Sequence, residues 1–320
     1  MSEVLDDYAL HEKLQRKGSL QRVGIIGCGS VGQEIARIIS RAGIDVIFID
    51  ISDERVSEIF LNINQQLDEI IDRWGLTESE KRAILSRIKG STDYNEIRNC
   101  NLIIETVSSN KPGSSIELRK EIFRKVEDYV SVDAVITSNI STLMISELAS
   151  VLKYPERAVG MHFMIPPSTV KIVEVVKGLN TNQQSFEFVC RFANMIGKKV
   201  ITINESPGNI STRLIVTLIN EACEALMEGV AQIESIDDTM KFGYGLKFGP
   251  FELADRIGLD KILKYMDNLY QEFGLQKFKA SPIIKRLVRA NNLGRKTGKG
   301  FYTYQNEKKT GQNITSTEIR

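Results

Sequence analysis

The sequence predicts an α/β protein with a doubly wound, mostly parallel sheet and a second, all-helical C-terminal domain. Short apolar runs typical of buried strands alternate with helical segments through the first two thirds of the chain. A glycine-rich loop separates the first strand-like run from the first helical segment. After Ile203 only helical patterns remain. Alternating strands and helices are typical of a parallel sheet covered by helices.

The first βαβ unit is predicted from two apolar runs, "RVGIIG" and "DVIFID", with the helical segment "SVGQEIARIISRAG" between them. Gly43 is expected to end this helix. The periodicity places one apolar face on it, formed by Val31, Ile35, Ile38, Ile39 and Ala42. Strand, helix and strand together span about 30 residues, as a βαβ unit requires.

A charged, amphipathic stretch over about 52–90 predicts a pair of helices inserted after the second strand. Further strands are expected at "NLIIETV", "AVITS", "RAVGMHF", "KIVEVV" and "KVITI", with helices between them.

Four segments follow from these patterns: a polar extension over 1–20, a dinucleotide-binding domain over 21–203, a helical substrate and dimerisation domain over 204–305, and a mobile tail over 306–320. "ESPGN" is the expected hinge between the domains. Pro250 and Pro282 are predicted in the first turns of helices, the latter behind Ser281 as a cap. The first C-terminal helix is expected to bury a stripe of Leu214, Leu218, Ala222, Ala225 and Leu226.

Composition narrows the function classes. The 320 residues are 42% hydrophobic with a net charge of +1, so nothing global favours nucleic acid or a membrane surface, and a small-molecule partner is expected. We expect a cytoplasmic protein, because the N-terminus is charged and no apolar run is long enough to span a membrane. The four cysteines lack paired or metal-like spacing, so we expect no disulfide and no metal site.

The loop "GCGSVG" over 27–32 has the G-x-G-x-x-G spacing of a Rossmann-type dinucleotide site. Such a loop alone often marks only a turn. Asp50, however, closes the second strand 18 residues after Gly32, where a carboxylate accepts the ribose hydroxyls of NAD and repels a 2′-phosphate. The sequence therefore predicts NAD as the cofactor.

His162, one of only two histidines in the chain, lies in the apolar run "AVGMHFMIPP". A lone histidine there is explained by core packing. The alternation in "VKIVEVVK" places Glu174 on the same face as Ile172 and Val176, and a carboxylate on an apolar face needs a partner. An imidazole held by that carboxylate can exchange a proton with an alcohol during hydride transfer. A surface glutamate on an edge strand gives the same pattern, so both interpretations stay open.

The sequence resembles the 3-hydroxyacyl-CoA dehydrogenase family, closest to its short 3-hydroxybutyryl-CoA type, from about Val23 to Tyr304. The resemblance rests on fragments in the family's order: "GCGSVG", "IIETV", "SNISTL", "GMHFMIPP" with "KIVEVVKG", "ESPGN", "GPFELADRIGLD" and "GRKTGKGFY". It implies an NAD-dependent oxidoreductase that acts on the C3 hydroxyl of an acyl-CoA and forms a homodimer.

The resemblance also implies roles for individual residues. His162 matches the catalytic histidine, Glu174 the glutamate that orients it, and Ser141 the serine that reaches the substrate's 3-oxygen. Cofactor contacts are implied for Gly27, Cys28, Gly29, Ser30, Val31, Gly32, Asp50, Arg119 and Lys296. Substrate contacts are implied for Ser141, Thr212, Gln66 and Arg73. A turn residue at Ser141, and a solvated helix face at Gln66 and Arg73, explain these residue types equally well.

Several positions differ from the family pattern. Ile165 replaces an asparagine three residues after the histidine. Asn209 replaces an aromatic residue, Thr212 replaces a substrate-contacting asparagine, and Ser109 replaces a glutamate, followed by an insertion of roughly five residues before Arg119. Loss of one preorganised hydrogen bond costs about 2 to 4 kcal/mol in the transition state.

Three functions follow from these residues. The first is an NAD-dependent dehydrogenase of a short 3-hydroxyacyl-CoA. The second is a dehydrogenase of a 3-hydroxy acid without CoA, which the changes at Ile165, Asn209 and Thr212 favour. The third is a weakly catalytic NAD-binding protein, against which the retained His162 and Glu174 argue.

Overall fold

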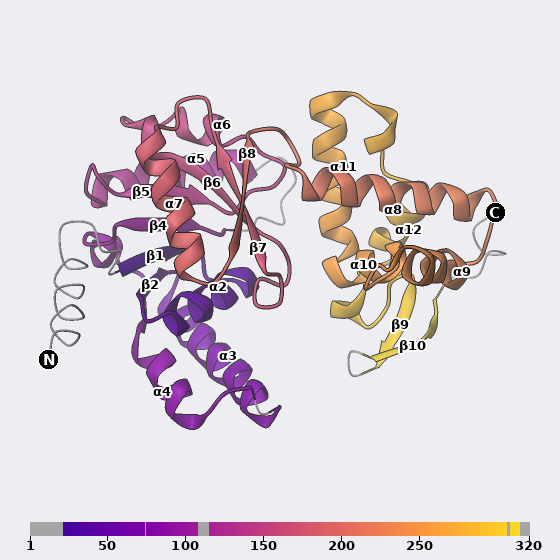
Figure 1. The fold of residues 1–320 in the computed structure, drawn as a ribbon, viewed down its shortest axis with the longest axis horizontal. Helices are drawn as coiled ribbons and strands as arrows, with labels where there is room; N and C mark the ends of the chain where they lie inside the picture. Colours follow the sequence, from indigo (N-terminus) through magenta and orange to yellow (C-terminus); the bar gives the residue numbers. More distant parts are fainter. Residues whose placement is uncertain (1–21, 74, 108–114, 306–307, 314–320) are drawn as a thin grey trace, which may run out of the picture. The chain divides into compact units, whose positions relative to one another are not determined.

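The computed structural model describes residues 22–73, 75–107, 115–305 and 308–313 (Figure 1). The N-terminal unit contains the described residues up to Ile140 together with Met144–Glu205. The C-terminal unit contains Ser141–Leu143 and the described residues from Ser206 onward. The predicted N-terminal extension, with His11, lies outside the described residues. In the part of the chain that the structure describes, no helix is long and apolar enough to cross a membrane.

The N-terminal unit is built on one eight-stranded sheet with the order β3-β2-β1-β4-β5-β6-β7-β8. Neighbouring strands are parallel except for β6 and β7, which are antiparallel. The strands are β1 (Arg22–Ile26), β2 (Asp45–Ile49), β3 (Ile88–Ser91), β4 (Leu102–Glu105), β5 (Val135–Ser138), β6 (Ala158–Phe163), β7 (Ile172–Lys177) and β8 (Lys199–Asn204). This sheet confirms the predicted fold class and each predicted strand.

Helices or 3₁₀ turns connect these strands, except β6 and β7, which a loop joins (Figure 1). They are α2 (Ser30–Arg41), α3 (Asp53–Asp72), α4 (Glu78–Ser86), α5 (Ser115–Tyr129), α6 (Ile145–Ala149) and α7 (Gln183–Met195), with short 3₁₀ turns η1 (Tyr94–Ile97) and η2 (Pro155–Arg157). On α2, Ile35 and Ile39 of the predicted face are fully buried, whereas Ala42 is exposed. The buried faces of α2, α3 and α7 join the sheet in one apolar core.

The predicted helical insert is present as α3 and α4, but its last residues form strand β3, which the sequence analysis did not predict. "IKGS" contains a lysine and a glycine and lacks the alternation of a strand. The glycine is required by packing, because a Cβ at Gly90 would lie 2.4 Å from the ring of Phe48. Strand β3 therefore pairs at the edge of the sheet because its backbone closely approaches β2.

The C-terminal unit is mainly helical, but it is not all-helical as expected, because its last two elements are strands. Its elements are α8 (Ser211–Met227), α9 (Ile233–Asp238), a π-helical turn η3 (Thr239–Gly243), α10 (Pro250–Ile257), α11 (Leu259–Phe273), η4 (Gln276–Phe278), α12 (Pro282–Arg289), η5 (Arg295–Thr297), β9 (Tyr302–Gln305) and β10 (Lys308–Gln312). Pro250 and Pro282 begin their helices as predicted. Ser281 is the N-cap residue of α12, but its side chain makes no capping hydrogen bond.

The buried face of α8 agrees with the predicted stripe only in part: Ala222 and Leu226 are buried as expected. Leu214 is 66% exposed, whereas the polar Thr212 and Asn220 are buried together with Val216, Ile219 and Cys223. The face is rotated because Asn220 is fully hydrogen-bonded inside the unit: its amide donates to the Lys277 and Lys279 carbonyls and accepts from Ser281 N. A satisfied polar side chain can occupy a core position that an apolar pattern does not reveal.

Two buried aspartates fix the β9 hairpin to the helices. Asp255 on α10 accepts hydrogen bonds from the Phe301 and Tyr302 amides and from the Tyr304 hydroxyl, each at 2.9 Å. Asp237 on α9 accepts from the Phe251 and Glu252 amides at 2.8 and 3.0 Å and from the Tyr302 hydroxyl at 2.8 Å. The hairpin is thus bound to α9 and α10 through its polar groups.

Part of the segment expected to be a mobile tail is ordered. Strand β10 pairs antiparallel with β9, with a register shift between Lys309 and Gly311. Lys309 Nζ lies 2.7 Å from a Glu252 carboxylate oxygen, and Asn313 bonds the backbone of Phe301. The polar composition that suggested disorder instead supplies these surface contacts. Residues 306–307 and 314–320 of the predicted tail lie outside the described residues.

Candidate active site

His162 and Glu174 face each other across the only antiparallel strand pair of the eight-stranded sheet. They are direct register partners on β6 and β7. His162 Nδ1 lies 2.8 Å from Glu174 Oε2, and the residues are 8% and 2% exposed. The β-strand alternation that put Glu174 on an apolar face therefore also puts it beside an imidazole. The structure brings together the two residues that the sequence analysis paired.

This contact defines what the imidazole can do. An ionised Glu174 only accepts hydrogen bonds, so Nδ1 carries the proton and Nε2 presents its lone pair. When Nε2 takes up a proton, the adjacent carboxylate stabilises the resulting imidazolium. The pair is thus equipped to exchange one proton with a bound alcohol or ketone.

Asn139 fixes the end of β6 and was not predicted as part of the site. Its side-chain oxygen accepts the backbone N–H of Phe163, the residue after His162, at 2.7 Å. Asn139 follows β5, the parallel neighbour of β6, and both strands end at the same edge of the sheet. Its place directly after a buried strand was the one signal that could have revealed it.

The glycine-rich loop and Asp50 lie together at the carboxyl ends of β1 and β2. They line a cavity of about 580 Å³, to which Arg55 on α3 and Thr106 and Val107 after β4 also contribute. Asp50 accepts the Cys28 amide at 2.8 Å and the Ile51 amide at 2.9 Å. The loop and the carboxylate are therefore fixed to each other before any ligand binds.

Space around the three glycines fits a dinucleotide. Gly27 has a φ of +79°, and a Cβ there would lie 2.4 Å from the Val107 side chain. A Cβ on Gly32 would lie 2.8 Å from the Gly27 carbonyl oxygen and from the Thr106 hydroxyl, so this glycine permits close strand–helix packing. At Gly29 nothing lies within 4 Å, which leaves the approach to the loop open. A pyrophosphate can reach the backbone there.

The start of α2 supplies donors for such a group. Gly29 is the N-cap residue without a side-chain capping bond, so the first amides of the helix, those of Ser30 and Val31, have no partner within it. Cys28 donates its amide to Asp50. Burial raises the pKa of its thiol and the charge of Asp50 raises it further, so the thiol stays protonated. The residues present fit NAD.

Arg119 lies on α5 in a buried polar cluster beside this cavity. Its guanidinium forms an ion pair with Glu105 and donates to the Ser138 hydroxyl at 3.1 Å and to the Val107 carbonyl. Glu105 also accepts the Val107 amide at 2.6 Å. The cluster fixes the backbone at Val107, where the cavity wall begins. A direct contact of Arg119 with the cofactor stays a prediction.

Gln66 and Arg73, expected near the acyl-CoA, occupy different environments on the insert. Gln66 Nε2 donates to Gln33 Oε1 on α2 at 3.1 Å, which joins α3 to the helix of the glycine loop. Arg73 caps the end of α3 and is exposed. Their substrate contacts stay predictions. Ser109 lies outside the described residues.

Ser141 and Thr212 belong to the C-terminal unit, and both are buried. Ser141 is the third residue after β5, and its neighbour Thr142 accepts a hydrogen bond from Asn268 Nδ2 at 2.8 Å. Among the described residues, none hydrogen-bonds the Ser141 hydroxyl, which leaves it available to a ligand. Thr212 lies in the first turn of α8, after Asn209, which has a φ of +49°.

Lys296, in the "GRKTGKG" stretch of the C-terminal unit, forms an ion pair with Asp260 at 2.5 Å, and both groups are partly exposed. Its predicted contact with the cofactor stays a prediction.

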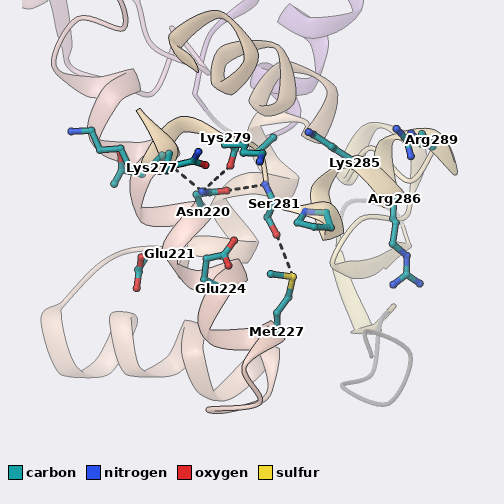
Figure 2. Close-up of a pocket in the computed structure, with 14 residues that line it drawn as sticks. Asn220, Glu221, Glu224, Met227, Lys277, Lys279, Ser281, Lys285, Arg286 and Arg289 are labelled. Carbon is teal, nitrogen blue, oxygen red and sulfur yellow. Dashed lines mark hydrogen bonds between the residues drawn. The ribbon is translucent and has the colours of Figure 1, made fainter. Parts of the chain in front are cut away.

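A cavity of about 650 Å³ in the same unit lies between α8 and α12 and is lined by Lys277, Lys279 and Lys285 among others (Figure 2). None of the predicted site residues lines it.

The sequence analysis quoted Thr106 and Val107 within "IIETV" but gave neither of them a role in the site. The Thr106 hydroxyl donates to the Gly27 carbonyl, and Val107 packs where a Gly27 side chain would lie. Strand order turns at β1, whose neighbours are β2 on one side and β4 on the other. Residues that follow the two strands at such a switch point line the ligand crevice, and this rule could have found them.

The glycine-rich loop with Asp50 and a buried histidine–glutamate pair, on one doubly wound sheet, define an NAD-dependent oxidoreductase. The model for the NAD binding domain of 3-hydroxyacyl-CoA dehydrogenase matches residues 22–206, and that for the C-terminal domain of 3-hydroxyacyl-CoA dehydrogenase matches residues 208–304. The chain therefore belongs to the 3-hydroxyacyl-CoA dehydrogenase family, as the sequence motifs indicated.

Individual relatives agree with this assignment. The 3-hydroxybutyryl-CoA dehydrogenase of Bradyrhizobium diazoefficiens is 35% identical over 90% of this chain and 97% of its own. The crystal structure of (S)-3-hydroxybutyryl-CoA dehydrogenase from Ralstonia eutropha matches with a TM-score of 0.82 and 37% identity, over 90% of this chain and all of that one (100%). A diketoreductase that acts on dicarbonyl compounds matches with a TM-score of 0.77 and 25% identity, over 89% and 99%.

Proposed function

We propose that the protein interconverts a short 3-hydroxyacyl-CoA and the 3-oxoacyl-CoA, with NAD as hydride acceptor and NADH as donor. The pair proposed is 3-hydroxybutyryl-CoA and acetoacetyl-CoA. The single observation that supports the chemistry is the buried contact of 2.8 Å between His162 Nδ1 and Glu174 Oε2. A buried carboxylate on an imidazole has the arrangement of a general base with its supporting acid residue.

In the oxidation, His162 Nε2 takes the proton of the substrate's 3-hydroxyl. Bound NAD supplies the hydride acceptor for the C3 hydrogen. Glu174 holds the ring through Nδ1 and stabilises the imidazolium while it exists. In the reduction, the same imidazolium returns the proton to the 3-oxygen as hydride arrives at C3. One proton and one hydride move in each direction, so the reaction balances without a further reagent.

Cofactor binding is proposed at the loop over 27–32, with Asp50 on the adenosine ribose hydroxyls. The fixed carboxylate and the open space at Gly29 support this assignment. Arg119 and Lys296 are proposed as further cofactor contacts. Ser141 is proposed to bind the 3-oxygen and Thr212 the thioester region, with Gln66 and Arg73 on the CoA moiety.

A second candidate is a dehydrogenase of 3-oxo acids or diketones without CoA. Ile165, half-buried in the loop after His162, offers hydrocarbon where the family has an amide. The similarity to a diketoreductase supports the same alternative, because that relative acts on dicarbonyl compounds. Under this alternative, Arg73 serves only as an exposed helix cap.

The deciding experiment measures the loss of NADH absorbance with acetoacetyl-CoA beside free acetoacetate at equal concentration. We expect rapid oxidation only with the CoA ester. Faster turnover of acetoacetate, together with no binding of CoA in calorimetry, contradicts the CoA assignment.

A second experiment tests the catalytic residue. His162→Ala is expected to lower turnover by roughly 10²- to 10⁴-fold while NADH binding is retained. Unchanged turnover in that variant contradicts the catalytic assignment.

We further propose that the protein is a cytoplasmic homodimer assembled through its C-terminal unit. Val230, Phe242 and Tyr244 in that unit are 70 to 83% exposed, and a second copy would cover this apolar surface. Sedimentation should give twice the chain mass of 36.0 kDa, and Phe242→Asp should lower it. A monomer at micromolar concentration contradicts the assembly.

A further inference from the structure

Lys198 is a buried lysine whose amine binds the loop between the two strands of the active site. The residue is 7% exposed. Its Nζ donates to the Pro167 carbonyl and to the Val170 carbonyl, each at 2.6 Å. Burial lowers the pKa of this amine, and the nearby charge of Glu34 opposes that shift. Charge-assisted bonds to carbonyls are stronger than neutral ones, so the amine holds both carbonyls firmly.

The local sequence places Lys198 there through the end of α7. Gly197 has a φ of +75°, and its amide bonds the Asn194 carbonyl, while the Lys198 amide bonds the Ala193 carbonyl. This is the Schellman arrangement, with a left-handed glycine followed by the residue that closes the helix. Lys198 is therefore fixed in the turn directly before β8.

The loop over 164–171 joins the strands that bear the catalytic pair. His162 is the penultimate residue of β6, and Glu174 is the third residue of β7. Inside the loop, the Thr169 and Val170 amides both bond the Pro166 carbonyl. From outside, Glu34 on α2 accepts the Ser168 amide at 2.9 Å, and Lys198 binds the two carbonyls.

We infer that Lys198 is a positioning residue for the oxidoreductase reaction: it clamps the 164–171 loop and so holds His162 in line with Glu174. The inference rests on the proposed role of that pair. Among the described residues, the Lys198 amine hydrogen-bonds the Pro167 and Val170 carbonyls and neither member of the pair, so it acts through the loop. The Glu34 contact connects the same loop to α2, the helix that begins at the cofactor loop.

Removal of the amine leaves two carbonyls without their donor inside a packed region. The loop then relaxes toward water, and the His162 ring loses its fixed place against Glu174. A displacement of about 1 Å at a reacting group lowers turnover by as much as 10²-fold. We therefore expect Lys198→Met to lower kcat by roughly 10- to 100-fold, with the NADH dissociation constant within about twofold of the parent value.

The matched control is Lys199→Met, which removes the exposed neighbouring lysine on β8. Lys198→Gln keeps an amide donor on a shorter side chain and should give an intermediate kcat. This second variant tests the inference if the methionine variant does not fold. All variants are compared at full length, with the folded fraction measured by circular dichroism.

Histidine NMR supplies a measurement that general destabilisation does not change. The chain has only two histidines, so ¹⁵N-histidine spectra of the parent and of His11→Asn assign His162 directly. We expect the hydrogen-bonded Nδ1 proton of His162 to weaken or shift in Lys198→Met and not in Lys199→Met. An unchanged His162 signal with unchanged kcat per folded molecule overturns the inference, even if the melting temperature falls.

The two proposals fail separately. If His162→Ala keeps full turnover, the catalytic role of the pair is wrong, while the His162 signal in Lys198→Met still tests whether the lysine positions the ring. If His162→Ala is inactive but Lys198→Met behaves as Lys199→Met in both measurements, only the positioning role is wrong.

Discussion

Both units of the molecule bury carboxylates, but they surround them with different partners. In the N-terminal unit Glu174 is 2% exposed and contacts the His162 imidazole. In the C-terminal unit Asp237 and Asp255 are 0 and 1% exposed and accept backbone amides and tyrosine hydroxyls. Imidazole exchanges protons near neutral pH, whereas amides and phenols keep theirs. Burial alone therefore does not identify a catalytic carboxylate; the partner does.

The largest effect is expected from Glu174→Gln. The amide keeps the shape of the side chain but removes the charge that stabilises the imidazolium and sets its tautomer. We expect kcat to fall by roughly 10²- to 10⁴-fold, with a melting temperature close to that of the parent. Steady-state kinetics and thermal denaturation check this. Retained turnover together with a large loss of stability would place Glu174 in the same structural class as Asp255.

Asp255→Ala is expected to show the opposite profile. It leaves two backbone amides and the Tyr304 hydroxyl without their acceptor. At about 1 to 3 kcal/mol for each unsatisfied group, the free energy of unfolding should fall by at least roughly 3 kcal/mol. The melting temperature of the C-terminal unit should fall by on the order of 10 °C. Asp238→Ala, at a half-exposed position, is the control and should change little.

The pH dependence of stability gives a milder test of the same residue. Burial raises the pKa of Asp255 from 3.8 to about 6, although its hydrogen-bond donors oppose the shift. The folded protein then holds a proton that the unfolded chain releases near pH 3.9. The bound proton therefore stabilises the folded state. This stabilisation is fully present below the pKa of Asp255 in the unfolded chain and is lost as the pH rises through about 6, its pKa in the folded protein. Its size is on the order of 3 kcal/mol.

Urea denaturation between pH 4.5 and 7.5 measures this effect. The free energy of unfolding of Asp255→Asn, which has no carboxyl at this position, should lack the decline that the parent shows across this range. If the free energy of unfolding changes equally with pH in the two proteins, Asp255 keeps an ordinary pKa despite its burial.

Ser281→Ala is expected to change the free energy of unfolding least. It compares a buried hydroxyl that does not cap its helix with an exposed hydroxyl that does. Ser281 is buried at the start of α12, but its Oγ caps no backbone amide and contacts two sulfur atoms, Met227 Sδ at 3.7 Å and the Cys223 thiol. We expect a loss below about 0.5 kcal/mol. Thr77→Ala removes a complete capping box at α4 and should cost about 1 kcal/mol. Chemical denaturation of both variants checks the difference, and an equal loss would mean that burial alone determines the value of a cap.

Much of the fold and the central pair followed from local pattern. Strand alternation identified Glu174 because one charged residue on an apolar face needs a partner, and the glycine spacing with Asp50 predicted the loop that is proposed to bind the cofactor. Strand β3 and the polar part of the buried face of α8 were not predicted, because Gly90 and Asn220 are placed by neighbours that lie far away in the sequence.

The supporting residues were missed for a related reason. Asn139 and Lys198 bind backbone groups of other segments, and the direction of a backbone N–H or carbonyl in an irregular loop leaves no mark in the sequence. Asn139 resembled a chance polar residue after a strand, and Lys198 an ordinary charged turn residue. Only the folded chain shows that Asn139 binds the end of β6 and that Lys198 binds the loop that follows it.

Because the space around Gly29 is open, a substitution at this position should block the nucleotide site without disturbing the fold. Its backbone angles, φ −69° and ψ −165°, suit any amino acid, and a methyl group there meets no other part of the described chain. A Gly29→Ala chain should therefore keep the parent's architecture while its side chain obstructs the pyrophosphate. This variant is therefore a negative control for cofactor binding: any thermal shift that NADH still produces in it reports binding elsewhere on the molecule.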